Sequence, residues 1–359
     1  MIGSIIFYFA ICFLLLFFAT RIEKKNNIRF FMLMLILTLT LVSGLRHQTV
    51  GIDTSGYVGL ISRLRDGYFL KLNNISEQGF ISLSYLLVNV SSGYTFALLI
   101  YSLITNTLII LRLYDYKNTA SFTWSVFIYY MVFYFATFNT IRQWIAMALI
   151  FFGTRYIGKS IIKFLIFVVL AVLMHASAIF ALFYIPLYYF SLNANSRKVT
   201  IRKFAMIIFA IAAGAFVYIT MANKYSSYLA SSLYGDVSWV NIFLILFMCF
   251  IILYDNNGKI VIRMNTCTAG GNETKGIKYE SLAFFVGIVL TLMVFFARYA
   301  DRIGQYFLLF ELVFFSHYIK KEKTRAITIV FVLALCLYLR IFSFVSSGYG
   351  EIPYIPFWS

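Results

Sequence analysis

The sequence predicts an all-α, polytopic integral membrane protein with about 12 transmembrane helices. Its 359 residues are 62% hydrophobic and only 12% charged, whereas charged residues make up about 25% of a soluble domain. Apolar runs long enough to cross a bilayer recur from end to end, and loops rich in Lys and Arg separate them. We therefore expect a single transmembrane domain over residues 1–359, with no separate soluble domain.

The apolar runs define the expected spans. They cover residues 2–20, 30–44, 93–111, 121–137, 141–157, 164–190, 204–221, 239–254, 281–297, 303–319 and 326–341. The run 164–190 has basic loops at both ends, and one helix cannot leave both of its ends on the same face of the membrane. We therefore divide it into two short helices that meet near His175–Ala178, each about 20 Å long. Residues 46–92 form a polar, extracytoplasmic stretch with an amphipathic piece over Phe80–Val90.

The distribution of basic residues predicts the orientation. Of the 30 Lys and Arg residues, 21 fall in the loops 21–29, 112–117, 155–163, 197–203, 259–278 and 320–325. Loops rich in positive charge stay in the cytoplasm, so both termini and the stretch 46–92 are expected outside. The net charge of +17 then follows from membrane topology, and nucleic acid is not expected as a partner.

Several polar side chains fall on the predicted extracytoplasmic side, at the mouths of helices far apart in the sequence. They are Arg46, Asp53, Arg142, His175, Arg298, Asp301 and Arg302. Charged groups at membrane depth are costly unless they face a cavity or a partner, and the planar guanidinium of arginine matches phosphate and carboxylate groups. We expect a site for an anionic group such as a lipid pyrophosphate, with Asn139 and Gln143 as neutral donors beside Arg142.

His175 is expected in the same outer site, where a neutral imidazole could accept a proton from an attacking hydroxyl. Simpler roles stay open, because the arginines could reach lipid headgroups, His175 could bond a main-chain carbonyl, and Arg46 could pair with Asp53. Glu311 is expected in mid-helix, paired with a buried arginine, and Arg340 is expected to tolerate lysine. The four cysteines show no metal-ligand spacing, so no metal and no disulfide framework are expected.

The order and spacing of several short motifs resemble those of a known family. The motifs are Arg46-x4-Gly51-x-Asp53-x3-Tyr57, Glu77-x-Gly79-Phe80, Phe138-Asn139-x-x-Arg142-Gln143-x-x-Ala146, Lys163-Phe164, His175-x-Ser177-Ala178, Arg298 to Tyr306 and Pro353-Tyr354. Together they resemble the EpsG-type polysaccharide polymerases, Wzy-like O-antigen and exopolysaccharide polymerases of bacteria. The resemblance runs through residues 44–180 and, more weakly, through 298–354.

The resemblance implies a metal-independent, inverting glycosyltransferase with a GT-C-like polymerase/ligase architecture and no cofactor. It would transfer a glycan from undecaprenyl pyrophosphate to the hydroxyl of an acceptor lipid-linked repeat unit, in the synthesis of lipopolysaccharide or capsule. Its implied place is the bacterial inner membrane, with the active site facing the periplasm or exterior. Its implied partners are the undecaprenyl-pyrophosphate-linked glycan, membrane lipid, a chain-length regulator and a flippase.

The resemblance also implies roles for residues that match the family's motifs. The catalytic roles fall on His175 and Arg142. The substrate-binding roles fall on Arg46, Asp53, Tyr57, Asn139, Gln143, Arg298, Arg302 and Tyr306.

Two other classes of function stay open. A lipid-linked oligosaccharide flippase would need polar residues along a path through both leaflets, whereas the polar residues here gather on one predicted side. A membrane O-acyltransferase that modifies the glycan would need an acyl-donor site open to the cytoplasm, and the sequence offers no candidate for one.

Overall fold

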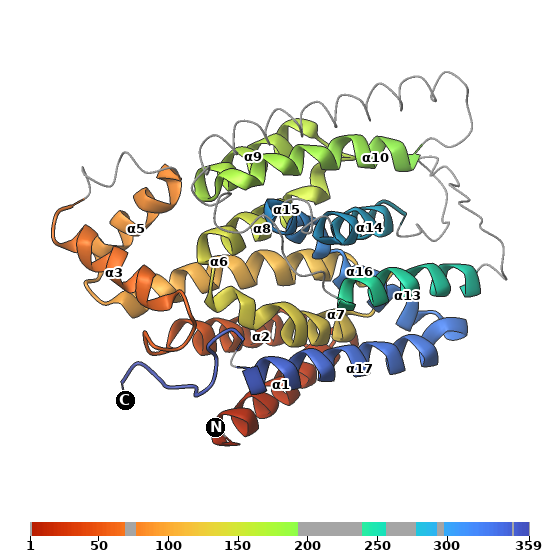
Figure 1. Cartoon of the computed structure of the whole chain (residues 1–359), viewed down its shortest axis with the longest axis horizontal. Helices are drawn as coiled ribbons and strands as arrows, with labels where there is room; N and C mark the ends of the chain where they lie inside the picture. Colours follow the sequence, from red (N-terminus) through yellow and green to blue (C-terminus); the bar gives the residue numbers. More distant parts are fainter. Residues whose placement is uncertain are drawn as a thin grey trace. The chain divides into compact units, whose positions relative to one another are not determined.

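The computed structural model (Figure 1) describes residues 2–68, 77–192, 239–255, 278–292, 298–346 and 348–358, and every named element within these ranges is a helix. The all-α class is therefore confirmed. The α-helices are α1 (Ile2–Glu23), α2 (Ile28–Gly44), α3 (Thr54–Arg65), α5 (Gln78–Val90), α6 (Tyr94–Asp115), α7 (Phe122–Ile128), α8 (Ile141–Gly153), α9 (Ile161–Met174), α10 (Tyr184–Leu192), α13 (Trp239–Asp255), α14 (Lys278–Leu292), α15 (Arg298–Leu308), α16 (Glu311–Lys320) and α17 (Glu322–Ser346). The expected span 204–221 and the basic loops 197–203 and 259–277 lie outside the described residues.

Three of the described helices, α1, α6 and α17, are long and apolar enough to cross a membrane. Shorter apolar helices accompany them: Ile28–Gly44, Gln78–Val90, Phe122–Phe138, Ile161–Met174, Ala176–Tyr189, Trp239–Asp255 and Tyr279–Leu292. These lengths and compositions agree with a helical membrane protein. The total of 12 crossings and the GT-C-like architecture stay predictions.

The long apolar run 164–190 is interrupted where we expected. The α9 helix ends at Met174, His175 follows, and a 3₁₀-helix over Ala176–Phe183 leads into α10. The run 121–137 is also less regular than a single α-helix, because α7 passes into a π-helix over Tyr129–Phe133 and a 3₁₀-helix over Tyr134–Phe138. Apolar periodicity does not distinguish these narrower and wider helices in such a continuously hydrophobic run.

Two expectations about helix boundaries are wrong. The polar stretch after residue 46 contains the helix α3, which we did not expect because its sequence is rich in polar residues and glycine. The expected span 303–319 is broken between Leu308 and Glu311, so Glu311 begins α16 and does not lie in mid-helix. Glu311 is buried, and it forms no ion pair with any residue in the described ranges.

The chain divides into two compact units that interleave in the sequence. The first unit comprises Met1–Phe152, Val169–Ala176 and Phe315–Ser359, and the second comprises Gly153–Val168 and Ser177–Phe314. In the first unit, α1 packs on α2 and α7, α2 packs on α6, and α3 and α5 lie side by side (Figure 1). In the second unit, α14 packs against α10, α13 and α15.

The C-terminal segment 348–358 lies along the loop that follows α2, within the first unit. The His47 amide donates to the Ile355 carbonyl at 2.8 Å, and the Phe357 amide donates to the Leu45 carbonyl at 2.9 Å. Glu351 is fully buried, and its carboxylate accepts hydrogen bonds from the Ser343 hydroxyl and the Tyr349 amide. The Arg340 guanidinium, 3% exposed, lies 3.7 Å from the same carboxylate. Arg340 is therefore a buried partner, and our expectation that it tolerates lysine loses its basis.

Candidate functional site

Three charged or titratable side chains meet in the first compact unit, each from the end of a different helix. Glu77 directly precedes α5, Arg142 is in the first turn of α8, and His175 directly follows α9. Arg142 Nη1 lies 2.5 Å from Glu77 Oε2, and His175 Nδ1 contacts Glu77 Oε1. One carboxylate thus bridges the guanidinium and the imidazole, and we call these three residues the Arg142–Glu77–His175 cluster.

A close helix contact brings Glu77 to His175. A Cβ atom at Gly79 would lie only 2.6 Å from Leu173 Cβ and 2.9 Å from the Leu173 carbonyl oxygen. Only glycine lets α5 approach the end of α9 this closely, and Glu77 and His175 each lie two residues from the contact. Glu77 itself adopts a left-handed backbone conformation with φ of +82°, which is uncommon for a residue other than glycine. Such conformations concentrate at functional sites.

The three side chains differ in their access to solvent. The Arg142 side chain is 41% exposed, whereas His175 is 16% and Glu77 only 5% exposed. Burial raises the pKa of the Glu77 carboxyl, but its contact with the His175 imidazole and the charge of the Arg142 guanidinium bring the pKa below its ordinary value. Glu77 is therefore ionised at neutral pH. The cluster presents an accessible guanidinium backed by a buried carboxylate.

Tyr57, on α3, lies beside the Arg142 guanidinium. Burial raises the pKa of the Tyr57 phenol, and the charge of Arg142 offsets part of that rise. The phenol therefore stays protonated and can donate a hydrogen bond. Tyr57 is the predicted substrate-binding residue that the structure places beside a predicted catalytic residue.

Arg46 does not reach this cluster directly. Its side chain is only 1% exposed, and it donates to the carbonyl oxygens of Ser43, Val50 and Phe138 and to the Thr54 hydroxyl. This burial favours a role in holding the loop after α2 over direct contact with substrate. The local ion pair with Asp53 that we considered is not formed among the contacts of Arg46.

Asp53 and Asn139 join the loop after α2 to the turn before α8. The Thr140 amide donates to Asp53 Oδ2 at 3.1 Å, and the Asp53 amide donates to Asn139 Oδ1 at 3.2 Å. The Asn139 side chain also donates to the Tyr349 carbonyl at 3.0 Å. Asn139 and Gln143 are both buried. Asp53 and Asn139 thus stabilise the turn that leads into Arg142.

The remaining predicted residues, Arg298, Arg302 and Tyr306, belong to α15 in the second compact unit. Arg302 is exposed, whereas Tyr306 is buried. The Tyr306 carbonyl accepts a hydrogen bond from the Tyr184 hydroxyl at 2.7 Å, and its own hydroxyl lies 3.2 Å from the Ser177 hydroxyl. These contacts assign Tyr306 to the packing of its unit.

Sequence reasoning named Glu77 within a family motif but gave it no role. The signal was present, since Glu77 is an acidic residue directly before an apolar amphipathic helix, on the side predicted to be poor in positive charge. Within the described ranges, no group of three or more His, Cys, Asp or Glu side chains could hold a metal ion.

The fold and the cluster define a helical membrane protein whose charged site is built from helix ends. The model of the EpsG family matches residues 29–357, nearly the whole chain, and the protein belongs to the EpsG family. Family membership supports a function of the polysaccharide-polymerase type, by glycosyl transfer. No curated protein and no solved structure matches the chain.

Proposed function

We propose that the protein is a polysaccharide polymerase of the bacterial inner membrane. It transfers a glycan from undecaprenyl pyrophosphate to a hydroxyl of an acceptor lipid-linked repeat unit, on the periplasmic or outer face. The observation that carries this proposal is the contact of one buried carboxylate, Glu77, with both Arg142 and His175. Membership of the EpsG family supports the same class of reaction.

The cluster supplies a proton acceptor in a defined orientation. An imidazole with its proton on Nδ1 carries its lone pair on Nε2, and we propose this tautomer for His175 because its Nδ1 contacts the Glu77 carboxylate. Nε2 can then accept the proton of the acceptor hydroxyl as its oxygen attacks the anomeric carbon. Glu77 is ionised, so it also stabilises the imidazolium that forms.

The guanidinium supplies the complementary charge. The bond between the anomeric carbon and the pyrophosphate oxygen breaks as the new glycosidic bond forms, and its electron pair leaves with undecaprenyl pyrophosphate. The half-exposed Arg142 is placed to stabilise this developing negative charge. Displacement by a single attack predicts inversion at the anomeric carbon. We propose Arg298 and Arg302 as further substrate-binding residues, because their motif matches the family's.

Purified protein with a lipid-linked repeat unit tests the proposal. His175→Ala should lower the rate of polymer formation by about 10²–10⁴-fold, the usual contribution of a general base. Binding of the lipid-linked donor should persist, since Arg142 remains. Polymer formation at the wild-type rate by His175→Ala would make the histidine structural and remove it from the mechanism.

A gene deletion separates the polymerase from the flippase. Loss of a polymerase should reduce the surface glycan from a ladder of lengths to a single repeat unit on a gel. Loss of a flippase should abolish the surface glycan altogether. Loss of acyl groups with an intact ladder would instead indicate the O-acyltransferase.

A further inference from the structure

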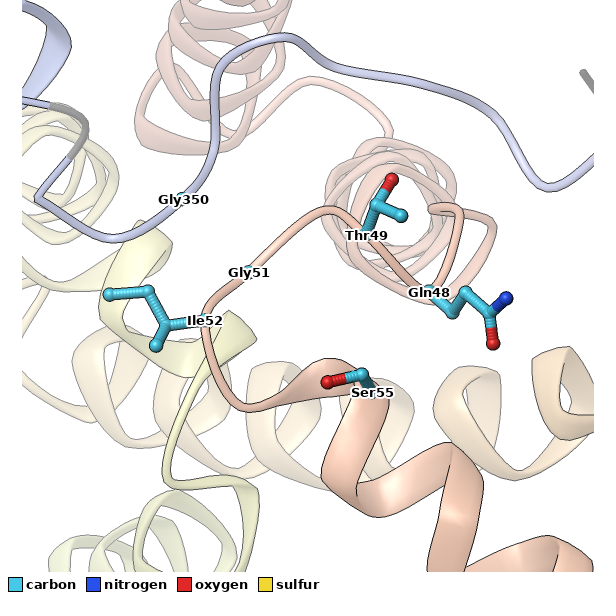
Figure 2. Close-up of a pocket in the computed structure, with 6 residues that line it drawn as sticks. All are labelled: Gln48, Thr49, Gly51, Ile52, Ser55 and Gly350. Atoms are coloured by element: carbon cyan, nitrogen blue, oxygen red, sulfur yellow. The ribbon is translucent and has the colours of Figure 1, made fainter.

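A cavity of about 520 Å³ opens beside the loop after α2, in the first compact unit and outside the Arg142–Glu77–His175 cluster. It is lined by Gln48, Thr49, Gly51, Ile52, Ser55 and Gly350. Figure 2 shows this loop as an arch, with Gly51 and Ile52 at its apex next to Gly350 and with Gln48 and Ser55 towards its open end. Ligand pockets in proteins measure about 300–1,000 Å³, so the cavity can take a short oligosaccharide.

The lining has the chemistry of a site for neutral polar molecules. None of its six described residues is charged. The Gln48 amide and the Thr49 and Ser55 hydroxyls each donate and accept hydrogen bonds, as sugar hydroxyls and acetamido groups do. Ile52, 63% exposed, offers an apolar surface to the face of a sugar ring. The exposed carboxylate of Asp53 follows in the same loop, so an anionic ligand is disfavoured there.

The cavity is built on a rigid backbone. Gly51 and Gly350 have φ of +94° and +67°, a conformation that favours glycine, and the Gly51 amide donates to the Gly350 carbonyl at 2.8 Å. A Cβ at Gly51 would lie 2.6 Å from the Thr54 hydroxyl oxygen. The buried Arg46 also donates to the Val50 carbonyl of the same loop. Such a preformed cavity lowers the cost of ordering the protein when a ligand binds.

Two hydrogen bonds connect the cavity loop to the cluster. The Asp53 amide donates to the Asn139 side chain, and the Asp53 carboxylate accepts from the Thr140 amide. Arg142 follows two residues later, in the first turn of α8. The cavity and the cluster therefore share the turn before α8, and a chain of several sugars could contact both.

We propose that this cavity is a binding subsite for neutral sugar residues of the glycan substrate. The inference rests on the proposed polymerase function and adds the place and the chemical class of the sugar contact. It predicts that neutral hexose and N-acetylhexosamine units bind there, and that uronic acids bind more weakly.

Saturation-transfer NMR on the full chain in nanodiscs tests the subsite, with lactose and N,N′-diacetylchitobiose as neutral probes and a uronic acid disaccharide as the anionic one. Ser55→Phe places an aromatic ring in the cavity and should weaken binding of the neutral probes at least about tenfold. Gly59→Phe is the matched control, since it adds the same ring one turn along α3 in open space. The double variant Gln48→Ala/Thr49→Ala removes the polar groups of two exposed residues and should also weaken binding without disturbing the fold.

Wild-type affinity for the neutral probes in both Ser55→Phe and Gln48→Ala/Thr49→Ala would overturn the subsite. Absence of any signal from neutral probes at millimolar concentration with the wild-type chain would overturn it too, as would stronger binding of the anionic probe. Failure of the proposed function has a different signature: the wild-type protein forms no polymer from a lipid-linked repeat unit, whatever the sugar-binding result.

Discussion

Glu77 and Arg142 are 65 residues apart in the sequence, and their side chains meet at 2.5 Å. Hydrogen bonds between a guanidinium and a carboxylate are among the stronger ones in proteins. This one joins the start of α5 to the start of α8, and the same carboxylate contacts His175. Arg142 and His175, which we predicted as catalytic, therefore both contact Glu77. Substitutions at Glu77 should affect the function of both residues.

Arg142→Lys should lower polymer formation by about 10²-fold or more, the effect of losing a preorganised donor to a developing charge. Lysine keeps the positive charge but loses the planar set of donors, so it cannot hold Glu77 and a phosphate in the same way. Protein level should be normal. The measurement is polymer length and rate with purified protein and a lipid-linked repeat unit.

Arg63→Lys is the matched control for Arg142→Lys. Arg63 is exposed on α3, and within the described ranges its side chain donates only to the Gly59 carbonyl of its own helix. It should retain nearly the wild-type rate. Equal activity of the two variants would show that Arg142 serves only as a membrane anchor.

Glu77→Gln should lower the melting temperature at neutral pH and leave it nearly unchanged in acid. Because the folded protein holds the pKa of Glu77 below its ordinary value of 4.5, the carboxylate stabilises the fold above that pH. The stabilisation is lost as the pH falls through the lowered pKa. Melting curves of wild type and variant from pH 8 down to about pH 3 measure the difference between their melting temperatures. This difference should narrow only below the ordinary pKa of a glutamate.

The same substitution should reduce polymer formation, because glutamine fixes the His175 tautomer less well and does not stabilise an imidazolium. Glu77→Asp is the conservative comparison, since it keeps the charge and should recover part of the rate. A melting-temperature gap that is constant with pH would show that folding does not shift the pKa of Glu77, contrary to the lowered pKa assigned to it.

Arg340→Met should destabilise the protein by about 3–5 kcal/mol, the typical cost of removing one partner from a buried ion pair. The Glu351 carboxylate is fully buried and would lose its cation. The double variant Arg340→Met/Glu351→Gln should recover part of the loss, and a double-mutant cycle by chemical or thermal denaturation measures the coupling. Arg63→Met, at an exposed position, should change stability by less than about 0.5 kcal/mol.

Cysteine labelling tests the predicted orientation. In a chain whose four native cysteines are replaced by alanine, Ser55→Cys should react with a membrane-impermeant thiol reagent in intact cells with a permeabilised outer membrane. Asn118→Cys, exposed after α6 next to a basic loop, should react only after the inner membrane is broken. The reverse pattern would place the cavity and the cluster in the cytoplasm.

Much of the fold follows from hydrophobicity, which depends on local sequence. The interruption after Met174 could be predicted because membrane topology forbids a single helix between two basic loops. The break before Glu311 could not, since Tyr306–Phe310 and Leu312–Phe315 are apolar on both sides of it and no glycine or proline marks a helix end there. The π- and 3₁₀-helices before Asn139 were missed for the same reason.

The site was predicted in part. Arg142 and His175 could be found because charge at membrane depth is costly and has to be explained. Arg46 was predicted to bind substrate and Glu77 was given no role. In the structure Glu77 lies in the cluster, whereas the buried Arg46 donates hydrogen bonds to the loop after α2. The pairing of acidic with basic residues depends on contacts between distant helices, such as that of Gly79 with Leu173. A local sequence pattern does not predict such contacts.

The hydrogen bonds between the segment 348–358 and the loop after α2 also have a consequence for synthesis of the chain, because they join its last residues to its first helices. Hydrogen bonds from this segment reach Ser4, a sequence separation of 350 residues. The loop around Gly51 is translated early, whereas Gly350, which accepts a hydrogen bond from Gly51, is translated only after hundreds of further residues. Until translation reaches that segment, the cavity beside the loop after α2 therefore lacks Gly350, one of the residues that line it. A chain released early should be inserted in the membrane but inactive, so that no partial product of translation can extend a glycan.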